Sequence, residues 1–319
     1  MKTIFIAIPS LKDPELFKTI DLIFKNATEP DNIYVGLFYQ FISLEEERNV
    51  IEKMSKYKNV RLKTGFVKDF LGISKGRNIA ISLYNQEDYF LQIDSHTNFE
   101  KGWDKNVIDI FNQAREHLGS EMVILNAYLN EYSYKKTIFG IKTFYPRGSS
   151  IPSYTYMNNS KMILDYLPRW RNNYDKQKGD FLPSRKFSAN FVFTYGKYIK
   201  DFLLEDEVVF WSEEYTKSLD LLGKGYALVH PNKPLKITHY YGNNFTPLSG
   251  GQRFVLEDYY TNKKELEEIT EKEKEFVIRY IDSHPYKAKY EAYAGIKFGK
   301  LLCKTIFYIP PVFFLKDIV

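Results

Sequence analysis

Asp94 and His96, two positions apart, are a pair of residues in this chain whose types and spacing could bind a metal ion. They follow the apolar run YFLQI in the stretch DYFLQIDSHTNF. If the chain is still extended there, the carboxylate and the imidazole project to the same side, because side chains alternate along a strand. A carboxylate oxygen and an imidazole nitrogen together suit Mn²⁺ or a similar divalent ion. An isolated Asp-x-His pair is more often a capping aspartate beside a solvent-facing histidine, but the place at the end of an apolar run favours the metal site.

A third ligand is needed, because a metal with two protein ligands otherwise completes its shell with water or substrate oxygens. The candidate is His239 in ITHYYG, which again ends an apolar, strand-like segment. Alone, such a histidine is more often packed in a core. His230 precedes a proline, and His117 and His284 lie among charged residues, so we expect these three to be structural or exposed.

Two pairs of charged residues begin predicted helices. Glu213 and Glu214 open the helix in SEEYTKSLDLL, and one of them is a candidate catalytic carboxylate at a cleft. Acids at that position also stabilise a helix simply by interacting with its dipole. Lys75 and Arg77, in GISKGRN, add basic side chains to the N–H groups of a helix N-terminus, which together form a place for anions. Solvated surface charge is an equally good interpretation of that pair.

The elements that must position these residues alternate between strand and helix. We expect strands at residues 3–9, 32–40, 59–67, 88–94 and 121–129, with helices at 13–27, 43–57, 74–85 and 102–118 between them. Asp13 is expected as the N-cap of the first helix, and Ser43 with Glu46 has capping-box spacing for the second. This alternation predicts an α/β fold with a mostly parallel, Rossmann-like sheet flanked by helices. Ligands of such sheets bind beyond the carboxyl ends of the strands, which is where Asp94 and His96 lie.

The second half of the chain is less regular. Residues 131–187 are rich in Tyr, Pro, Ser and Arg with weak periodicity, so we interpret them as an acceptor-side excursion from a catalytic domain that spans residues 1–255. Residues 256–319 are predicted to be a helical, basic and aromatic C-terminal extension, which is a candidate oligomer contact.

Composition narrows the class of protein. The chain has 319 residues, a formal net charge of +5 and one cysteine, Cys303, which excludes an intrachain disulfide and a cysteine-based zinc site. The mild positive charge permits an anionic partner without requiring one. No apolar run is long enough to span a membrane. We therefore expect a cytoplasmic enzyme, located in the host cytoplasm if its source is a virus.

Four blocks in order carry a resemblance to a known family. GISKGRNIAISLYNQEDYFLQIDSHTNFEKGWD, FSANFVFTYG, FWSEEYTKSLDLLGKGYALVHP and ITHYYG resemble the nucleotide-sugar glycosyltransferases of GT-A fold. More specifically, they resemble the UDP-GlcNAc-dependent polypeptide N-acetylglucosaminyltransferases that modify hydroxyproline on a cytosolic ubiquitin-ligase subunit. The polypeptide GalNAc-transferases, which share the D-x-H motif, are similar at a greater distance. The resemblance covers about residues 2–245 and not the C-terminal tail.

The resemblance implies a metal site and a donor. Asp94 and His96 match the metal-binding motif and His239 the distal ligand, so that Mn²⁺ or another divalent cation would hold the diphosphate of a UDP-sugar. Asp94 thereby also belongs to the donor-binding residues, and sugar transfer is expected to retain the anomeric configuration.

The remaining site residues follow the same resemblance. Pro9 would border the uridine, with Lys75 and Arg77 near the nucleotide, and Glu213 and Glu214 match the paired acids of the family. The segment SANFVF departs from the pattern, because Asn190 stands where relatives commonly have a small residue.

The expected function is a metal-dependent, retaining transfer of a sugar, GlcNAc by resemblance, from a UDP-sugar to a hydroxyl group on a protein or glycan. One alternative changes the acceptor to a hydroxymethylated base of viral DNA, for which the basic, aromatic tail and the net charge leave room. Another alternative is a non-catalytic module that binds a glycan or a protein, although the complete set of metal ligands argues against it. The sequence does not identify the acceptor.

Overall fold

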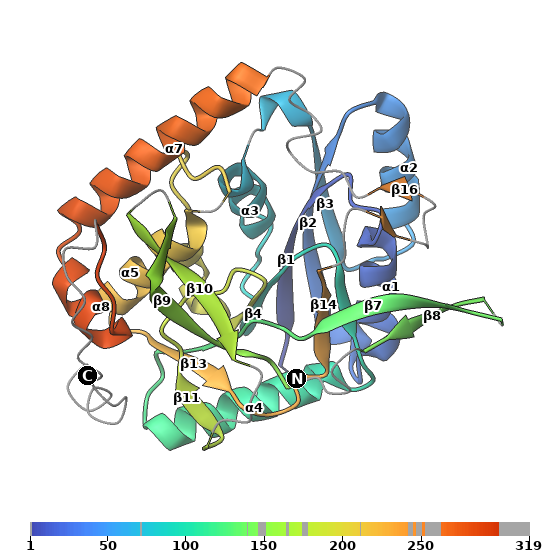
Figure 1. Cartoon of the computed structure of the whole chain (residues 1–319). Coiled ribbons are helices and arrows are strands. Elements are labelled where there is room, and N and C mark those ends of the chain that lie inside the picture. The colour runs from blue at the N-terminus through green and yellow to red at the C-terminus, as the bar shows by residue number, and fades with distance from the viewer. Residues whose placement is uncertain are drawn as a thin grey trace.

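An eight-stranded sheet forms the centre of the fold, in the strand order β11-β13-β6-β12-β4-β1-β2-β3 (Figure 1). Its strands are β1 (Ile4–Leu11), β2 (Ile33–Phe41), β3 (Val60–Phe66), β4 (Tyr89–Ile93), β6 (Val123–Asn126), β11 (Phe181–Pro183), β12 (Phe191–Tyr195) and β13 (Ala227–Pro231). The first four strands run parallel to one another, as do β6 and β13. The sheet is therefore mostly parallel, and the expected α/β class is confirmed.

The computed structural model describes residues 2–70, 72–138, 140–145, 151–163, 166–173, 178–210, 212–241, 245–246, 251–252 and 263–299. The tail after residue 299 and residues 256–262, both parts of the predicted C-terminal extension, lie outside the described residues, as do residues 253–255.

Helices cover both faces of the large sheet, because its central strands are apolar on both sides. Along β1, Ile4, Ile6 and Ile8 point into one core cluster, and the alternate residues Phe5 and Ala7 point into another. The first cluster is closed by α1 (Leu16–Asn26), α2 (Leu44–Met54) and α4 (Trp103–Leu118). The second is closed by α3 (Ile73–Ile81), the 3₁₀ segment η3 (Gly196–Phe202) and α5 (Glu213–Gly223). Two short 3₁₀ turns, η1 (Pro30–Asn32) and η2 (Val67–Asp69), complete this half of the chain.

Of the two predicted helix N-caps, Ser43 of α2 is confirmed and Asp13 of α1 is not. The Ser43 hydroxyl accepts the backbone N–H of Glu46, which confirms the predicted cap. The return bond of the capping box differs by one residue, because the Glu46 carboxylate accepts the N–H of Ile42 and not that of Ser43. Asp13 is not the N-cap of α1, because the helix begins at Leu16 and its N-cap is Glu15. The carboxylate of Asp13 instead accepts the backbone N–H of Glu15 at 2.9 Å.

β12 runs antiparallel to both of its neighbours, β4 and β6. The chain leaves the sheet at the carboxyl end of β6 and β12 starts at that same end, so β12 runs backwards. Between them in the chain, β11 pairs antiparallel with β13 at the edge of the sheet. Asn126 fastens the end of β6 to the start of β12. Its side-chain amide donates to the carbonyl oxygens of Ser188 at 2.8 Å and Phe191 at 2.9 Å, and its side-chain oxygen accepts the N–H of Ser188.

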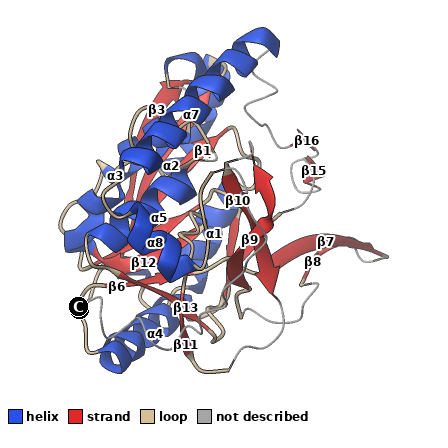
Figure 2. Cartoon of the chain, turned by 60° about the vertical axis from the view of Figure 1, so that its left-hand side comes forward, coloured by secondary structure: helices blue, strands red, loops and turns tan. Residues whose placement is uncertain are grey.

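The weakly periodic excursion contains strands that its sequence pattern did not predict. They form two units, β7 (Glu131–Thr137) with β8 (Gly140–Phe144), and β9 (Tyr154–Ile163) with β10 (Leu167–Asn173). The β7–β8 hairpin projects from the body of the molecule in both views (Figures 1 and 2). A second sheet, in the order β5-β14-β7-β8, joins this hairpin to β5 (Thr97–Phe99) and β14 (Ile237–Tyr240).

The C-terminal helices α7 (Lys263–Ser283) and α8 (Lys287–Ala294) pack on α5. Val277 and Ile281 of α7 share a buried cluster with Tyr215 and Leu219 of α5 and with Tyr290 of α8. Two short strands, β15 (Phe245–Thr246) and β16 (Gly251–Gln252), pair between β14 and α7 in the chain. Among the described residues, no helix combines the length and the apolar character needed to cross a membrane.

Candidate active site

The pairing of two short strands brings the predicted metal ligands together. β4 ends at Ile93, and Asp94 and His96 lie in the turn that leads into β5. β14 pairs antiparallel with β5, which aligns His239 with Thr97, next to His96. The site therefore lies beyond the carboxyl end of a central strand, where the sequence placed it.

Asp94, His96 and His239 each offer one ligand atom, and these atoms all lie within 4.8 Å of one another. His239 Nε2 lies 3.0 Å from Asp94 Oδ2, and the two imidazole rings meet edge to face with centroids 4.5 Å apart. Both histidines are buried, whereas the Asp94 side chain is about a quarter exposed. One carboxylate and two imidazoles, open to solvent on the carboxylate side, fit a divalent ion such as Mn²⁺.

The charges around Asp94 keep it ionised. Burial alone would raise its pKa, but the hydrogen bond from His239 and the positive charge of Arg77 outweigh burial, so the pKa of Asp94 lies below its usual value. An ionised carboxylate is the form that binds a cation.

Asp13 orients His96. Its Oδ2 lies 2.6 Å from His96 Nδ1 and accepts the Ser95 hydroxyl at 3.1 Å, and the Asp13 side chain is buried. Because Nδ1 is engaged by this carboxylate, Nε2 is the ring nitrogen of His96 that faces a metal. A carboxylate that holds a metal-binding histidine in this way fixes the ring orientation and raises its basicity. From the sequence alone, Asp13 was expected only to cap a helix.

Arg77 joins the metal ligands to the paired acids. Its Nη2 lies 3.0 Å from Asp94 Oδ1, and its Nε lies 2.7 Å from Glu213 Oε1. The guanidinium is buried, and its Nη1 has no hydrogen-bond partner among the described residues. Burial raises the pKa of Glu213 to about 7, although the charge of Arg77 opposes that shift.

Glu214 has a different environment from its neighbour Glu213. Its Oε2 lies 2.6 Å from Lys186 Nζ, and its Oε1 accepts the backbone N–H of Ala189 at 3.2 Å. The Glu214 side chain is about a quarter exposed, whereas that of Glu213 is about 4% exposed. Burial lowers the pKa of Lys186, although Glu214 opposes the shift. The more accessible acid is therefore Glu214, and it is held by a buried lysine.

Tyr241 and Asn190 line the other side of the metal ligands. The Tyr241 ring lies 4.2 Å from the ring of His239 and stacks on Tyr128 at 4.8 Å. The Asn190 amide donates to the Tyr241 hydroxyl at 2.6 Å, and that hydroxyl donates to the carbonyl oxygen of Leu129. The residue that departs from the family pattern thus supports the aromatic group packed on His239.

The two remaining predicted donor-binding residues differ in their relation to this cluster. Pro9 lies on β1 at the level of Asp94. Ala7 pairs with Gln92 on the parallel strand β4, and Pro9 and Asp94 each follow these paired residues by two positions. Pro9 is buried beneath α3. A Cβ atom added to Gly76 of that helix would lie 3.2 Å from the Cβ atom of Pro9. Lys75 is half-buried on α3 and forms no ion pair with any described residue. The structure thus places Pro9 at the level of the cluster on the neighbouring strand, and gives Lys75 no hydrogen bond or ion pair to the described residues of the cluster.

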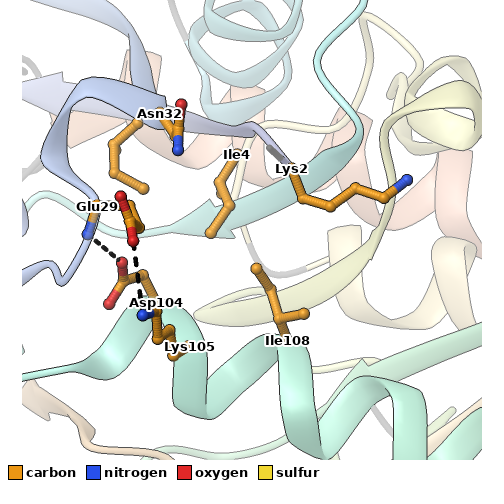
Figure 3. A pocket seen from close by; sticks show the side chains of 8 residues that line it. Lys2, Ile4, Glu29, Asn32, Asp104, Lys105 and Ile108 are labelled. Carbon is orange, nitrogen blue, oxygen red and sulfur yellow. Dashed lines mark hydrogen bonds and ion pairs between the residues drawn. The ribbon is translucent and has the colours of Figure 1, made fainter.

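A cavity of about 210 Å³ lies at the opposite, amino edge of the sheet (Figure 3). It is lined by the start of β1, by the turn that leads into β2 and by the first two turns of α4. Asp104, one of its lining residues, accepts the backbone N–H groups of Thr28 and Glu29. This cavity contains none of the predicted site residues, and its acid is occupied in holding a turn.

The family model described as Glycosyltransferase (GlcNAc) matches residues 43–289, well over half of the chain. The chain belongs to this family of GlcNAc glycosyltransferases. The matched range includes all three candidate metal ligands, Arg77 and both paired acids. No curated protein sequence matches the chain.

The solved structures that resemble this glycosyltransferase include GalNAc-T7 and TarS. GalNAc-T7, crystallised with UDP, GalNAc and Mn²⁺, is 13% identical with a TM-score of 0.53, and the match covers 76% of this chain and 44% of that one. TarS from S. aureus, in complex with UDP-GlcNAc, is 12% identical with a TM-score of 0.51, and the match covers 91% of this chain and 70% of that one. The glycosyltransferase thus spans under half the length of the GalNAc-T7 chain. These likenesses concern the fold, and they confirm the GT-A architecture.

Sequence reasoning missed Asp13 as a partner of His96 and Lys186 as the partner of Glu214. Nothing in the sequence around a histidine indicates which carboxylate will orient its ring in the folded protein. Lys186 lies at the end of the excursion, where no periodic pattern distinguishes a buried lysine from a solvated one.

Proposed function

We propose that this glycosyltransferase transfers GlcNAc from UDP-GlcNAc to a hydroxyl group on a protein or glycan, with a divalent cation, Mn²⁺ by preference, held by Asp94, His96 and His239. The observation that carries the proposal is the convergence of three ligand atoms within 4.8 Å, from distant parts of the chain, at the ligand-binding edge of the sheet. Two solved structures of the same fold support the donor, because one contains UDP-GlcNAc and the other UDP with Mn²⁺.

The chemistry requires stabilisation of a leaving diphosphate. A divalent cation supplies this as a Lewis acid when it is bound. Arg77 adds positive charge beside Asp94, and its unpartnered Nη1 is a donor available to a further oxygen. Pro9 would border the uridine, since it lies one strand away at the same level as Asp94. Lys75, on the same helix as Arg77, would lie near the nucleotide.

The two acids divide their roles in this proposal. Glu213 holds Arg77 in place through its 2.7 Å ion pair. Glu214, which is more exposed and is held by Lys186, faces the sugar or the acceptor hydroxyl. Retention of the anomeric configuration and the likeness to the hydroxyproline-modifying transferases belong to the proposal as well.

The alternatives fare differently. Membership of a glycosyltransferase family favours an enzyme over a non-catalytic binding module. The basic, aromatic tail that suggested a DNA acceptor lies, after residue 299, outside the described residues. The cytoplasmic location, the domain boundary at residue 255 and an oligomer contact through the C-terminal extension stay predictions.

The decisive experiment measures UDP release from a panel of UDP-sugars with and without Mn²⁺, and needs no acceptor because slow hydrolysis suffices. We expect release from UDP-GlcNAc that depends on Mn²⁺ and is lost in Asp94→Ala. Asp109→Ala, which removes an exposed aspartate from α4, is the matched control and should retain wild-type release. Equal release from Asp94→Ala and wild type would contradict the metal assignment, and calorimetry showing no metal-dependent UDP binding would contradict the enzyme.

A further inference from the structure

The start of α5, which carries both paired acids, is held by a carboxylate from a distant helix. Glu273 Oε1, on α7, accepts the backbone N–H groups of Val209 at 3.1 Å, Phe210 at 2.9 Å and Ser212 at 3.2 Å. The Ser212 hydroxyl donates to the same oxygen at 2.6 Å. Glu273 is about 2% exposed, so a single buried oxygen collects four hydrogen bonds.

The same short segment also contacts the helix that carries Arg77. The backbone N–H of Ile73, at the start of α3, donates to the carbonyl oxygen of Val209 at 2.6 Å. The segment therefore lies between the N-terminus of α3 and the side of α7. Because Arg77 and Glu213 stand on the two helices that meet there, their 2.7 Å ion pair depends on how this segment is held.

A carboxylate is well suited to this place. The first N–H groups of a helix and the residues before it lack partners within the helix, and the helix dipole favours negative charge at that end. Ser212 is the N-cap of α5, yet its side chain accepts no capping hydrogen bond and donates to Glu273 instead. The N–H group of this N-cap residue, together with those of Val209 and Phe210 before it, is thus satisfied from another helix.

The attachment of α7 does not depend on Glu273 alone. Val277 and Ile281, both fully buried, pack against Tyr215 and Leu219 of α5. These apolar contacts keep α7 docked when the carboxylate is changed, so variants of Glu273 are expected to fold.

We propose that Glu273 is a positioning residue for sugar transfer: it fixes the start of α5, so that Glu213 meets Arg77 and Glu214 meets the reacting sugar. This inference rests on the proposed function. It also makes α7 part of the catalytic unit, although α7 lies within the stretch that the sequence assigned to a separate extension.

The test compares Glu273→Ala with Glu273→Gln, whose amide oxygen still accepts the four donors. We expect Glu273→Ala to lower kcat for UDP-GlcNAc hydrolysis at least tenfold, with KM for the donor within about twofold of wild type, because the metal ligands stay in place. Glu273→Gln is expected to restore kcat to within about threefold of wild type. Full kcat in Glu273→Ala would overturn the proposal.

Two controls separate positioning from general loss of stability. Val277→Ala weakens the docking of α7 without touching the segment before α5, and Glu275→Gln removes an exposed acid from the same helix. Both are expected to retain wild-type kcat at temperatures below their melting points. An equal loss of kcat in Val277→Ala, at a matched loss of melting temperature, would overturn a specific role for Glu273.

A second readout does not depend on turnover. Backbone amide exchange at residues 209–216 is expected to be at least tenfold faster in Glu273→Ala than in wild type or Glu275→Gln. Should wild type release UDP from no donor, the proposed function fails, while these exchange rates still decide whether Glu273 fixes the start of α5. Unchanged exchange in Glu273→Ala would overturn that claim.

Discussion

The backbone N–H of Tyr240 donates a hydrogen bond to the carbonyl oxygen of His96 across 3.0 Å. This bond belongs to the pairing of β14 with β5 and sets the register that places the neighbouring His239 beside Asp94. The candidate metal site is therefore closed by backbone pairing rather than by flexible loops, which gives its ligands the fixed geometry that metal binding needs.

Changing Asp13 is expected to weaken metal binding without removing a ligand. In Asp13→Asn the charge that holds His96 Nδ1 is lost, and changes of this kind cost about 10- to 100-fold in metal affinity. Calorimetry with Mn²⁺ measures the affinity, with Asp109→Asn as the matched control on an exposed site. An affinity equal to wild type would show that Asp13 does not orient a metal ligand.

Stability is expected to fall as the pH rises through the region where Glu213 titrates. The folded-state pKa is raised from 4.5 to about 7, so the fold binds a proton more tightly than the unfolded chain. The resulting cost to stability is absent below about pH 4.5, grows up to about pH 7 and is complete above it. From the size of that shift, the full cost is roughly 3 kcal/mol.

Glu213→Gln, which imitates the protonated acid, should therefore raise the melting temperature at pH 8 and flatten the dependence of stability on pH between 4.5 and 7. Thermal unfolding at several pH values provides the measurement. A variant that is less stable than wild type at pH 8 would show that the ion pair with Arg77 outweighs the burial of Glu213. Turnover should fall in either case, because Arg77 loses one of its two carboxylates.

Lys186→Met is expected to lower kcat at least tenfold, or about 1.4 kcal/mol of transition-state free energy. Methionine fills a similar volume but leaves Glu214 without the ammonium group 2.6 Å away that fixes it. Donor hydrolysis measures the effect, and Lys200→Met, on an exposed position of η3, is the control. If both variants turn over at the wild-type rate, Glu214 needs no such support.

Gly36, on β2 against α3, and Gly76, within α3, are expected to respond differently to replacement by alanine. A Cβ at Gly36 would lie 2.7 Å from the backbone oxygen of Ala80 and 2.4 Å from the Phe5 ring, so Gly36→Ala must displace helix from sheet. We expect a loss of about 1–3 kcal/mol. At Gly76 the nearest atom lies 3.2 Å away, and the gain in helix propensity of about 1 kcal/mol offsets the contact. Denaturant unfolding of both variants tests this ordering, which equal losses would contradict.

The sequence predicted the fold where its local signals were strong. The alternation of apolar runs, such as the one around Ile6, with periodic helices, such as the one containing Ile20, predicted the parallel sheet. The position of Asp94 directly after such a run predicted that the candidate site lies at the carboxyl ends of the strands. His239 could be proposed from its type and context, but its closeness to His96 depends on a strand pairing that no local pattern records.

The residues that escaped prediction share one property. Asp13 looked like a helix cap, Lys186 like a solvated lysine and Glu273 like one of many acids on a charged helix. Each is buried, and each meets its partner only after distant segments have packed. The role of such a charged side chain depends on a long-range contact, and no periodic pattern in the sequence indicates that contact.

Asn126 ties together the two points where the excursion leaves and rejoins the core of the sheet. The excursion is also anchored between those points, because β11 pairs with β13 in the large sheet and β7 pairs with β14, which carries His239. An exchange of this stretch for one with a different target would therefore have to keep β7 and β11. Otherwise the strand of the distal metal ligand would lose one of its two neighbours.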